Sequence, residues 1–175
     1  MSVRQIESAF QHMFDAFHER SFTKSYRLCQ SNERTLLPLM RMFLRGWFGR
    51  RMSPEVPTKL KSAVTGKGRV DFVLGGIPVE VVVRLPEEAG SKLKAIRNNT
   101  ELQKLLLHRG RAVLVLLDFS DVPLSRGELE TSYRNWREPC EFGQGYHGLT
   151  PFSVCYFYRQ ARQPASEPIA LRIRT

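Results

Sequence analysis

Residues 67–120 constrain the fold of this chain more than any other segment. Mostly apolar runs occupy 69–74 and 77–85, and the Gly75-Gly76 pair between them is typical of a tight β-turn. The second run is continuously apolar, which predicts a strand buried on both faces. A helix over 91–109, with Ser91 as N-cap, and a buried strand over 111–119 are expected next. Because that strand follows a helix, it should pair parallel in the sheet.

The remaining segments predict helices on both sides of these strands. Pro38 is compatible with a helix over 33–48 only if it lies in the first turn. The other expected elements are a helix over 3–19, a short helix from Ser21 to Leu28, a proline-containing linker over 50–57, a strand over 58–65, a helix from Ser125 to about 137, a loop over 138–151, and strands over 152–160 and 169–175. This order predicts an α/β protein with a mixed sheet flanked by helices. Two parts are expected, an N-terminal helical segment (1–30) and an α/β domain (31–175).

The charge balance favours an anionic partner. Lys and Arg number 27 against 17 Asp and Glu, and the formal net charge is +10. This composition indicates nucleic acid. The alternatives are an anionic membrane surface, which usually requires a basic amphipathic helix or a lipid anchor, and a basic protein without a charged partner, since the charge is dispersed.

Cysteine usage and the N-terminal sequence indicate a cytoplasmic protein. The odd set Cys29, Cys140 and Cys155 contains no CxxC pair, which argues against a disulfide framework and a structural zinc. Glu7 and His12 interrupt the first apolar segment, so no signal peptide is expected. No apolar run approaches the roughly 20 residues of a membrane span.

Two acidic residues stand inside the central apolar strands. Asp71 lies in RVDFVL and Glu80 lies in VEVVVR, just after the turn. Carboxylates on neighbouring strands can lie side by side, and such a pair can hold a hard divalent cation against a phosphodiester. The alternative is an ion pair of Glu80 with Arg84 or Arg69.

The strand order and the two acids resemble the PD-(D/E)xK nuclease-like superfamily, over residues 33–119. The resemblance implies a restriction-endonuclease-like three-layer sandwich and, in an active protein, Mg²⁺ or Mn²⁺. Asp71 matches the metal-binding Asp of the second strand, and Glu80 matches the acid of the tripeptide. The third member is Val82 instead of Lys.

Other residues match the family's pattern less directly. Glu33 matches a Glu that completes the metal shell. Arg84, Lys92 and Lys94 are candidates for the charge that the missing Lys would supply, although Arg is a poor base. Gln103 and Lys104 match a helix that can face the active site, and we expect Gln103 at the catalytic site and Lys104 at nucleic acid. The other expected contacts to nucleic acid are Arg41, Arg45, Arg50, Arg51 and Arg69; for the Arg residues of the helix, an ordinary solvated face is the alternative.

Three functions remain open at this point. The first is a metal-dependent nuclease acting on DNA. The second, favoured by Val82, is an inactive protein of the same fold that binds nucleic acid. The third is an assembly or scaffold protein, in which the apolar face of residues 3–17 contacts a second copy or a partner rather than the chain's own core.

Overall fold

The computed structural model describes residues 1–25, 33–59, 67–108, 110–136, 152–159 and 169–173. The helices are α1 (Val3–Phe17), α2 (Arg20–Ser25), α3 (Glu33–Phe48), α4 (Asn99–Leu106) and α5 (Arg126–Arg134), with short 3-10 turns η2 (Gly49–Arg51) and η3 (Gly90–Leu93). The strands are β1 (Met52–Lys59), β2 (Lys67–Leu74), β3 (Ile77–Arg84), β4 (Ala112–Asp118), β5 (Phe152–Tyr158) and β6 (Ile169–Ile173).

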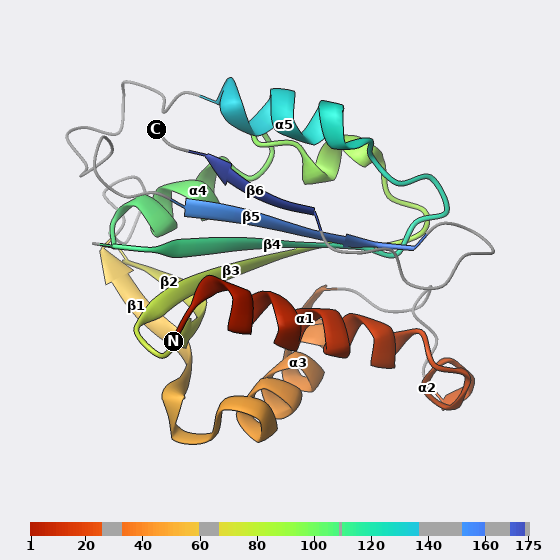
Figure 1. The fold of residues 1–175 in the computed structure, drawn as a ribbon, viewed down its shortest axis with the longest axis horizontal. Coiled ribbons are helices and arrows are strands. Elements are labelled where there is room, and N and C mark those ends of the chain that lie inside the picture. Colours follow the sequence, from red (N-terminus) through yellow and green to blue (C-terminus); the bar gives the residue numbers. More distant parts are fainter. Residues whose placement is uncertain (26–32, 60–66, 109, 137–151, 160–168, 174–175) are drawn as a thin grey trace.

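These strands form one mixed sheet in the order β1-β2-β3-β4-β5-β6. The first three are antiparallel neighbours, β3, β4 and β5 run parallel, and β6 returns antiparallel at the edge. α1 and α3 lie on one face, and α4 and α5 lie on the other (Figure 1). The predicted α/β class, the parallel pairing of β4 and the edge strand at 169–173 are therefore confirmed.

The central hairpin follows from its turn. Gly75 and Gly76 have φ of 54° and 86°, values that favour glycine and suit a two-residue hairpin turn. Leu74 consequently pairs with Ile77, and the register is fixed from there. Every residue of β3 is buried, as its continuous apolar sequence predicts.

Each face of the sheet carries its own core. The apolar side of α1 packs with α3 against Phe72, Val81 and Leu117. The other core joins α4 and α5 to Val82, Leu114 and their neighbours. The face of residues 3–17 is thus buried in the chain's own core, which was the alternative to contact with a second copy or a partner. Among the described helices, none combines the length and apolar content that a bilayer crossing requires.

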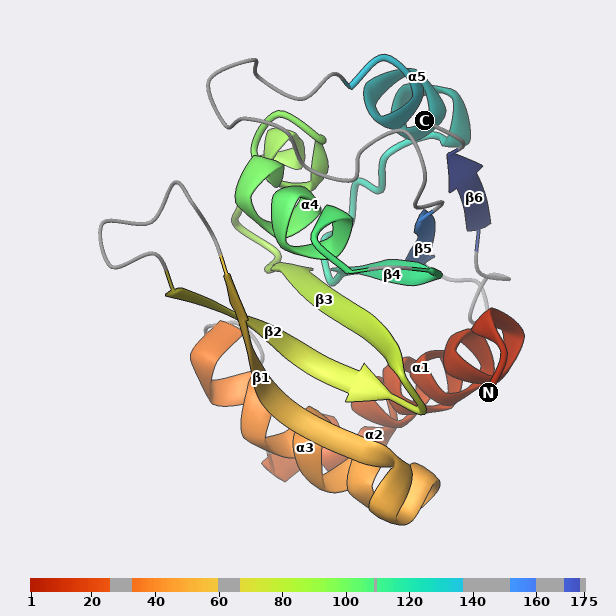
Figure 2. The ribbon, with the colours of Figure 1, turned by 90° about the vertical axis from the view of Figure 1, so that its left-hand side faces the viewer.

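The segments before and after the hairpin differ from their predicted structure. The expected linker over 50–57 is largely strand β1, because an edge strand tolerates Pro54 and Pro57, which a central strand would not (Figure 2). The strand expected over 58–65 begins earlier, and its residues 60–65 lie outside the described part. The helix expected over 91–109 is only the turn η3 followed by α4. There the Asn98 side chain donates to the carbonyls of Lys92 and Lys94, which competes with helical hydrogen bonding.

The other helices differ from prediction in smaller ways. Pro38 lies inside α3 rather than in its first turn, so one backbone hydrogen bond is missing from that helix. α5 begins at its capping box, Ser125 with Glu128, as expected, but ends at Arg134. The short helix predicted to reach Leu28 is described only to Ser25, and the expected loop over 138–151 lies outside the described residues.

Candidate metal and phosphate site

Asp71 lies where strand β2 is irregular. The β2–β3 ladder stops at the Phe72–Val79 pair, and the β1–β2 ladder skips the Glu55–Asp71 position. Val70 and Val73, three residues apart, both join the core under α4, so the two-residue alternation of a strand is broken here. The Asp71 carboxylate accepts the Val81 backbone N–H at 2.8 Å, in place of a ladder bond. The irregularity therefore directs Asp71 toward β3.

Glu80 projects from β3 toward α4, where it meets a lysine. Its Oε2 accepts from Lys104 Nζ at 2.9 Å, and the Glu80 side chain is 1% exposed against 15% for Lys104. The other oxygen, Oε1, is buried and has no hydrogen-bond partner among the described residues. A buried carboxylate oxygen without a donor is costly, so this oxygen is suited to a cation or a proton.

The pKa values show that the two acids act on each other. Burial, and next the charge of Asp71, raise the pKa of Glu80 to about 9. Burial also raises the pKa of Asp71, although the Val81 N–H and Lys104 oppose the shift. Burial disfavours the ammonium of Lys104, but the carboxylates of Glu80 and Asp71 outweigh it and raise the lysine pKa. The two acids of the hairpin thus converge, and one lysine does not fully compensate them.

Two further carboxylates border this pair. Glu33, at the start of α3, has a raised pKa because of burial and the charge of Asp71, and it accepts a hydrogen bond from the Val83 backbone. Glu101, on α4, acts electrostatically on Asp71, Glu80 and Glu33. Sequence reasoning missed Glu101. Its position three residues before Lys104, on the same helix side, is the signal that could have found it.

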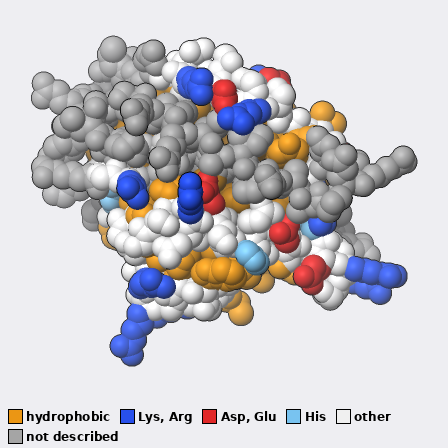
Figure 3. Space-filling model, in the orientation of Figure 1, with side chains coloured by type: hydrophobic (Ala, Val, Ile, Leu, Met, Phe, Trp, Pro, Cys, Tyr) orange, Lys and Arg blue, Asp and Glu red, His pale blue; other side chains and the backbone are white. Residues whose placement is uncertain are grey.

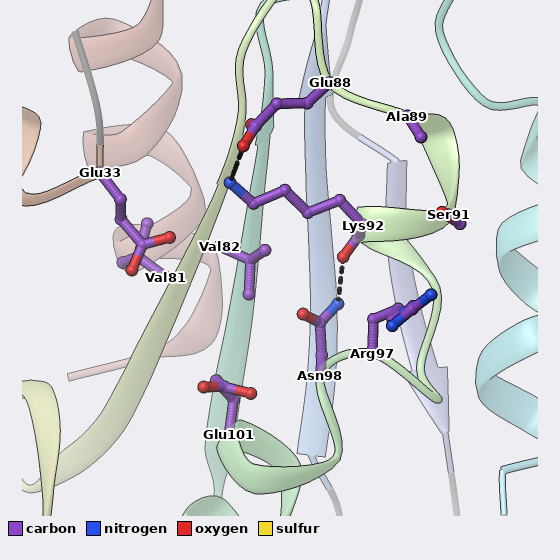
Figure 4. A pocket seen from close by; sticks show the side chains of 10 residues that line it. All are labelled: Glu33, Val81, Val82, Glu88, Ala89, Ser91, Lys92, Arg97, Asn98 and Glu101. Atoms are coloured by element: carbon purple, nitrogen blue, oxygen red, sulfur yellow. Dashed lines mark hydrogen bonds and ion pairs between the residues drawn. The ribbon is translucent and has the colours of Figure 1, made fainter.

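A pocket of about 500 Å³ opens beside the acid pair, where β2 no longer covers the edge of β3. In Figure 4 Glu33 lies to the left of Val82 and Glu101 below it, while Asn98 lies to its right and the Lys92 side chain extends above it to Glu88. The complete lining is Glu33, Val81, Val82, Glu88, Ala89, Ser91, Lys92, Arg97, Asn98 and Glu101. The position at which the family's motif has Lys is therefore a wall of this pocket.

The other catalytic candidates lie at different places. Lys92 lines the pocket, and its Nζ bonds Glu88 at 2.7 Å. Lys94 acts on Glu128, at the start of α5, rather than on the acid pair. Gln103 is buried and lies on the same side of α4 as Asn99, four residues earlier. The Asn99 side chain accepts a hydrogen bond from Trp136, so Gln103 faces that side of the helix and turns away from Lys104.

Arg84 belongs to a separate ion pair. Its Nη1 lies 3.2 Å from Asp118 Oδ2 and also donates to the Val122 carbonyl. Its Nε donates to the Glu88 carbonyl. Glu80 therefore pairs with neither of the arginines considered from the sequence. Lys104, expected at nucleic acid, is its partner.

The remaining basic candidates lie around α3 and β1. Arg41 and Arg69 both bond Glu55, and Arg45 donates to the Met52 carbonyl at 3.0 Å. Arg50 and Arg51 are exposed in η2. Figure 3 shows Lys and Arg side chains scattered over the visible face rather than gathered in a stripe.

The acid pair has the ligand number of a magnesium site that is completed by its substrate. Within the residues that the structure describes, no three Asp, Glu, His or Cys side chains are grouped to hold a metal ion. Mg²⁺, however, is commonly bound by one or two carboxylates together with waters and substrate phosphates.

Comparisons of the chain with protein-family models, with curated proteins and with solved structures found no match.

Proposed function

We propose that this chain is a nuclease-like protein of restriction-endonuclease-like fold, in which Asp71, Glu80 and Lys104 form a cation-dependent phosphodiesterase site acting on DNA. The observation that carries the proposal is the buried Oε1 of Glu80, which has no described donor and lies beside a second carboxylate. The helix, three-strand meander, helix and parallel strand support the finer fold assignment. The net charge of +10 supports a polyanionic substrate.

Each residue has a distinct role in this proposal. Asp71 and Glu80 would bind Mg²⁺ or Mn²⁺, which, when bound, polarises a phosphate and lowers the pKa of water. Lys104 supplies the ammonium that Val82 cannot, because its Nζ already lies 2.9 Å from Glu80. Its charge would stabilise the negative charge that develops on the phosphate. Arg84 has no part in this chemistry, because Asp118 and backbone carbonyls hold its guanidinium.

The decisive experiment compares plasmid cleavage in Mg²⁺ or Mn²⁺ by the wild type, Asp71→Asn and Glu80→Gln. We expect both substitutions to abolish cleavage and to weaken Mn²⁺ binding, measured by calorimetry. Asp121→Asn removes an exposed acid just beyond β4 and serves as the matched control. Cleavage that persists in both variants would contradict the site.

Two further results would separate the alternatives. If Mn²⁺ binds through Asp71 and Glu80 but no DNA is cut, the chain is the inactive form, a nucleic-acid-binding protein. Binding of DNA should then weaken steeply with salt, because phosphate contacts release counterions. A wild type that neither binds Mn²⁺ nor cuts DNA would rule out the proposal.

A further inference from the structure

We infer that the pocket beside the acid pair receives one unpaired nucleotide of the substrate, at a strand end or extruded from a duplex. This inference rests on the proposed function and adds to it the form of the substrate. It begins from the opening of the sheet: β3 continues past Val79 alongside β4, while its ladder to β2 has already ended. The edge of β3 at Val81 and Val82, which has no ladder partner in β2, becomes the wall of a pocket about 500 Å³ in volume.

The size of the pocket favours a small ligand. A volume of about 500 Å³ falls in the range typical of sites for single small molecules and cofactors. A base pair with both of its backbones would need a wide groove instead. Enzymes that accept a single nucleotide from a duplex extrude it into such a pocket.

The charged side chains of the lining leave one place for a phosphate. Glu33 and Glu101 lie on the side of the acid pair, with which they interact electrostatically. The opposite wall, from Glu88 to the start of α4, carries Lys92, whose Nζ is held by the Glu88 carboxylate at 2.7 Å, and Arg97 (Figure 4). A phosphate between these walls would meet the Arg97 guanidinium on one side, and on the other side it would need the divalent ion of the acid pair to offset Glu33 and Glu101.

The rest of the pocket offers apolar surface and one amide. The amide nitrogen of Asn98 is engaged by the Lys92 and Lys94 carbonyls, and its oxygen points toward Val82 in Figure 4. Val81, Val82 and Ala89 add apolar contact. These groups suit the sugar and base of a nucleotide, whereas a bare metal or inorganic phosphate would leave them unused.

Binding of thymidine 5′-monophosphate with Mg²⁺, measured by calorimetry, tests the inference without any cleavage step. Ala89 lies on the pocket wall and is exposed, so Ala89→Trp fills the pocket without removing a charge. We expect Ala89→Trp and Arg97→Ala to weaken binding at least tenfold. Arg126→Ala, on the exposed face of α5, should not change it.

The outcomes separate this inference from the proposed function. If the wild type cuts DNA but binds no mononucleotide, or if both pocket variants bind it normally, the pocket does not hold a nucleotide and the inference fails alone. If Mn²⁺ does not bind through Asp71 and Glu80, both proposals fail. Because Arg97 is exposed, its variant should fold even if Ala89→Trp does not. A single-stranded oligonucleotide should compete with the mononucleotide better than a blunt duplex does.

Discussion

The two buried ion pairs of the sheet differ in how completely they are satisfied. Asp118 accepts from Arg84, from the Tyr156 hydroxyl at 2.7 Å and from the Ser120 backbone N–H at 3.0 Å. Glu80 accepts from Lys104 with one oxygen only, and its second oxygen lacks a described donor. Both acids lie under the same helical layer.

The difference indicates two kinds of role. A fully bonded buried pair is costly to break but needs nothing further, and Arg84–Asp118 holds together the ends of β3, β4 and β5. In the incompletely bonded pair, Glu80 keeps a buried oxygen that lacks a described donor, and its pKa is raised to about 9. Strongly perturbed acids are candidates for function, because a ligand can supply the missing interaction, and Glu80 lies on the strand whose Val81 and Val82 line the pocket.

The first test of this difference removes the cation of each ion pair in turn. Arg84→Met should destabilise the fold by about 3–5 kcal/mol, because it leaves Asp118 buried with an uncompensated charge. Lys104→Met should cost much less, because Glu80 can take up a proton instead. Urea unfolding at neutral pH measures both, and equal losses would contradict the distinction.

Catalysis should show the opposite ranking. Lys104→Ala is expected to lower the DNA cleavage rate about 10²–10³-fold, roughly 3–4 kcal/mol of transition-state stabilisation. The reason is that Lys104 Nζ is the ammonium bonded to the acid pair. Initial rates in Mn²⁺ measure this effect, with Lys24→Ala, on exposed α2, as the control. A rate that is unchanged in Lys104→Ala would remove this residue from the mechanism.

The pH dependence of stability gives a smaller and sharper test. The pKa of Glu80 is raised from 4.5 to about 9 on folding, so its stabilising proton uptake is complete below about pH 4.5 and is lost as the pH rises toward 9. The free energy of unfolding of the wild type should therefore fall more between pH 5 and pH 9 than that of Glu80→Gln. We expect the difference between the two proteins to grow by up to about 1.4 kcal/mol per pH unit within this window, and the opposing effect of Lys104 is already contained in the raised pKa. Parallel pH profiles would contradict the raised pKa.

The sequence could predict the acid pair but not its partners. The register set by the Gly75-Gly76 turn, continued along the strands, would place Asp71 opposite Glu80, but the described ladder ends one pair earlier, at Phe72 and Val79. The roles of Lys104 and Glu101 depend on where α4 begins. Sequence periodicity placed that start near Ser91, whereas hydrogen bonds from the Asn98 side chain delay it to Asn99. No local pattern encodes that competition.

The proline-bearing edge strand β1 has a consequence for self-association. An outermost strand ordinarily offers a row of donors on which a foreign strand can assemble, and this is a common route to aggregation. Pro54 and Pro57 lack N–H groups and stand three residues apart in one register, so one of them faces the free edge and leaves a gap in the hydrogen bonds of a segment docking along β1. The two prolines led the sequence analysis to predict a linker instead of a strand. They thus also hinder fibril formation through this edge of the sheet in a basic, sheet-rich protein.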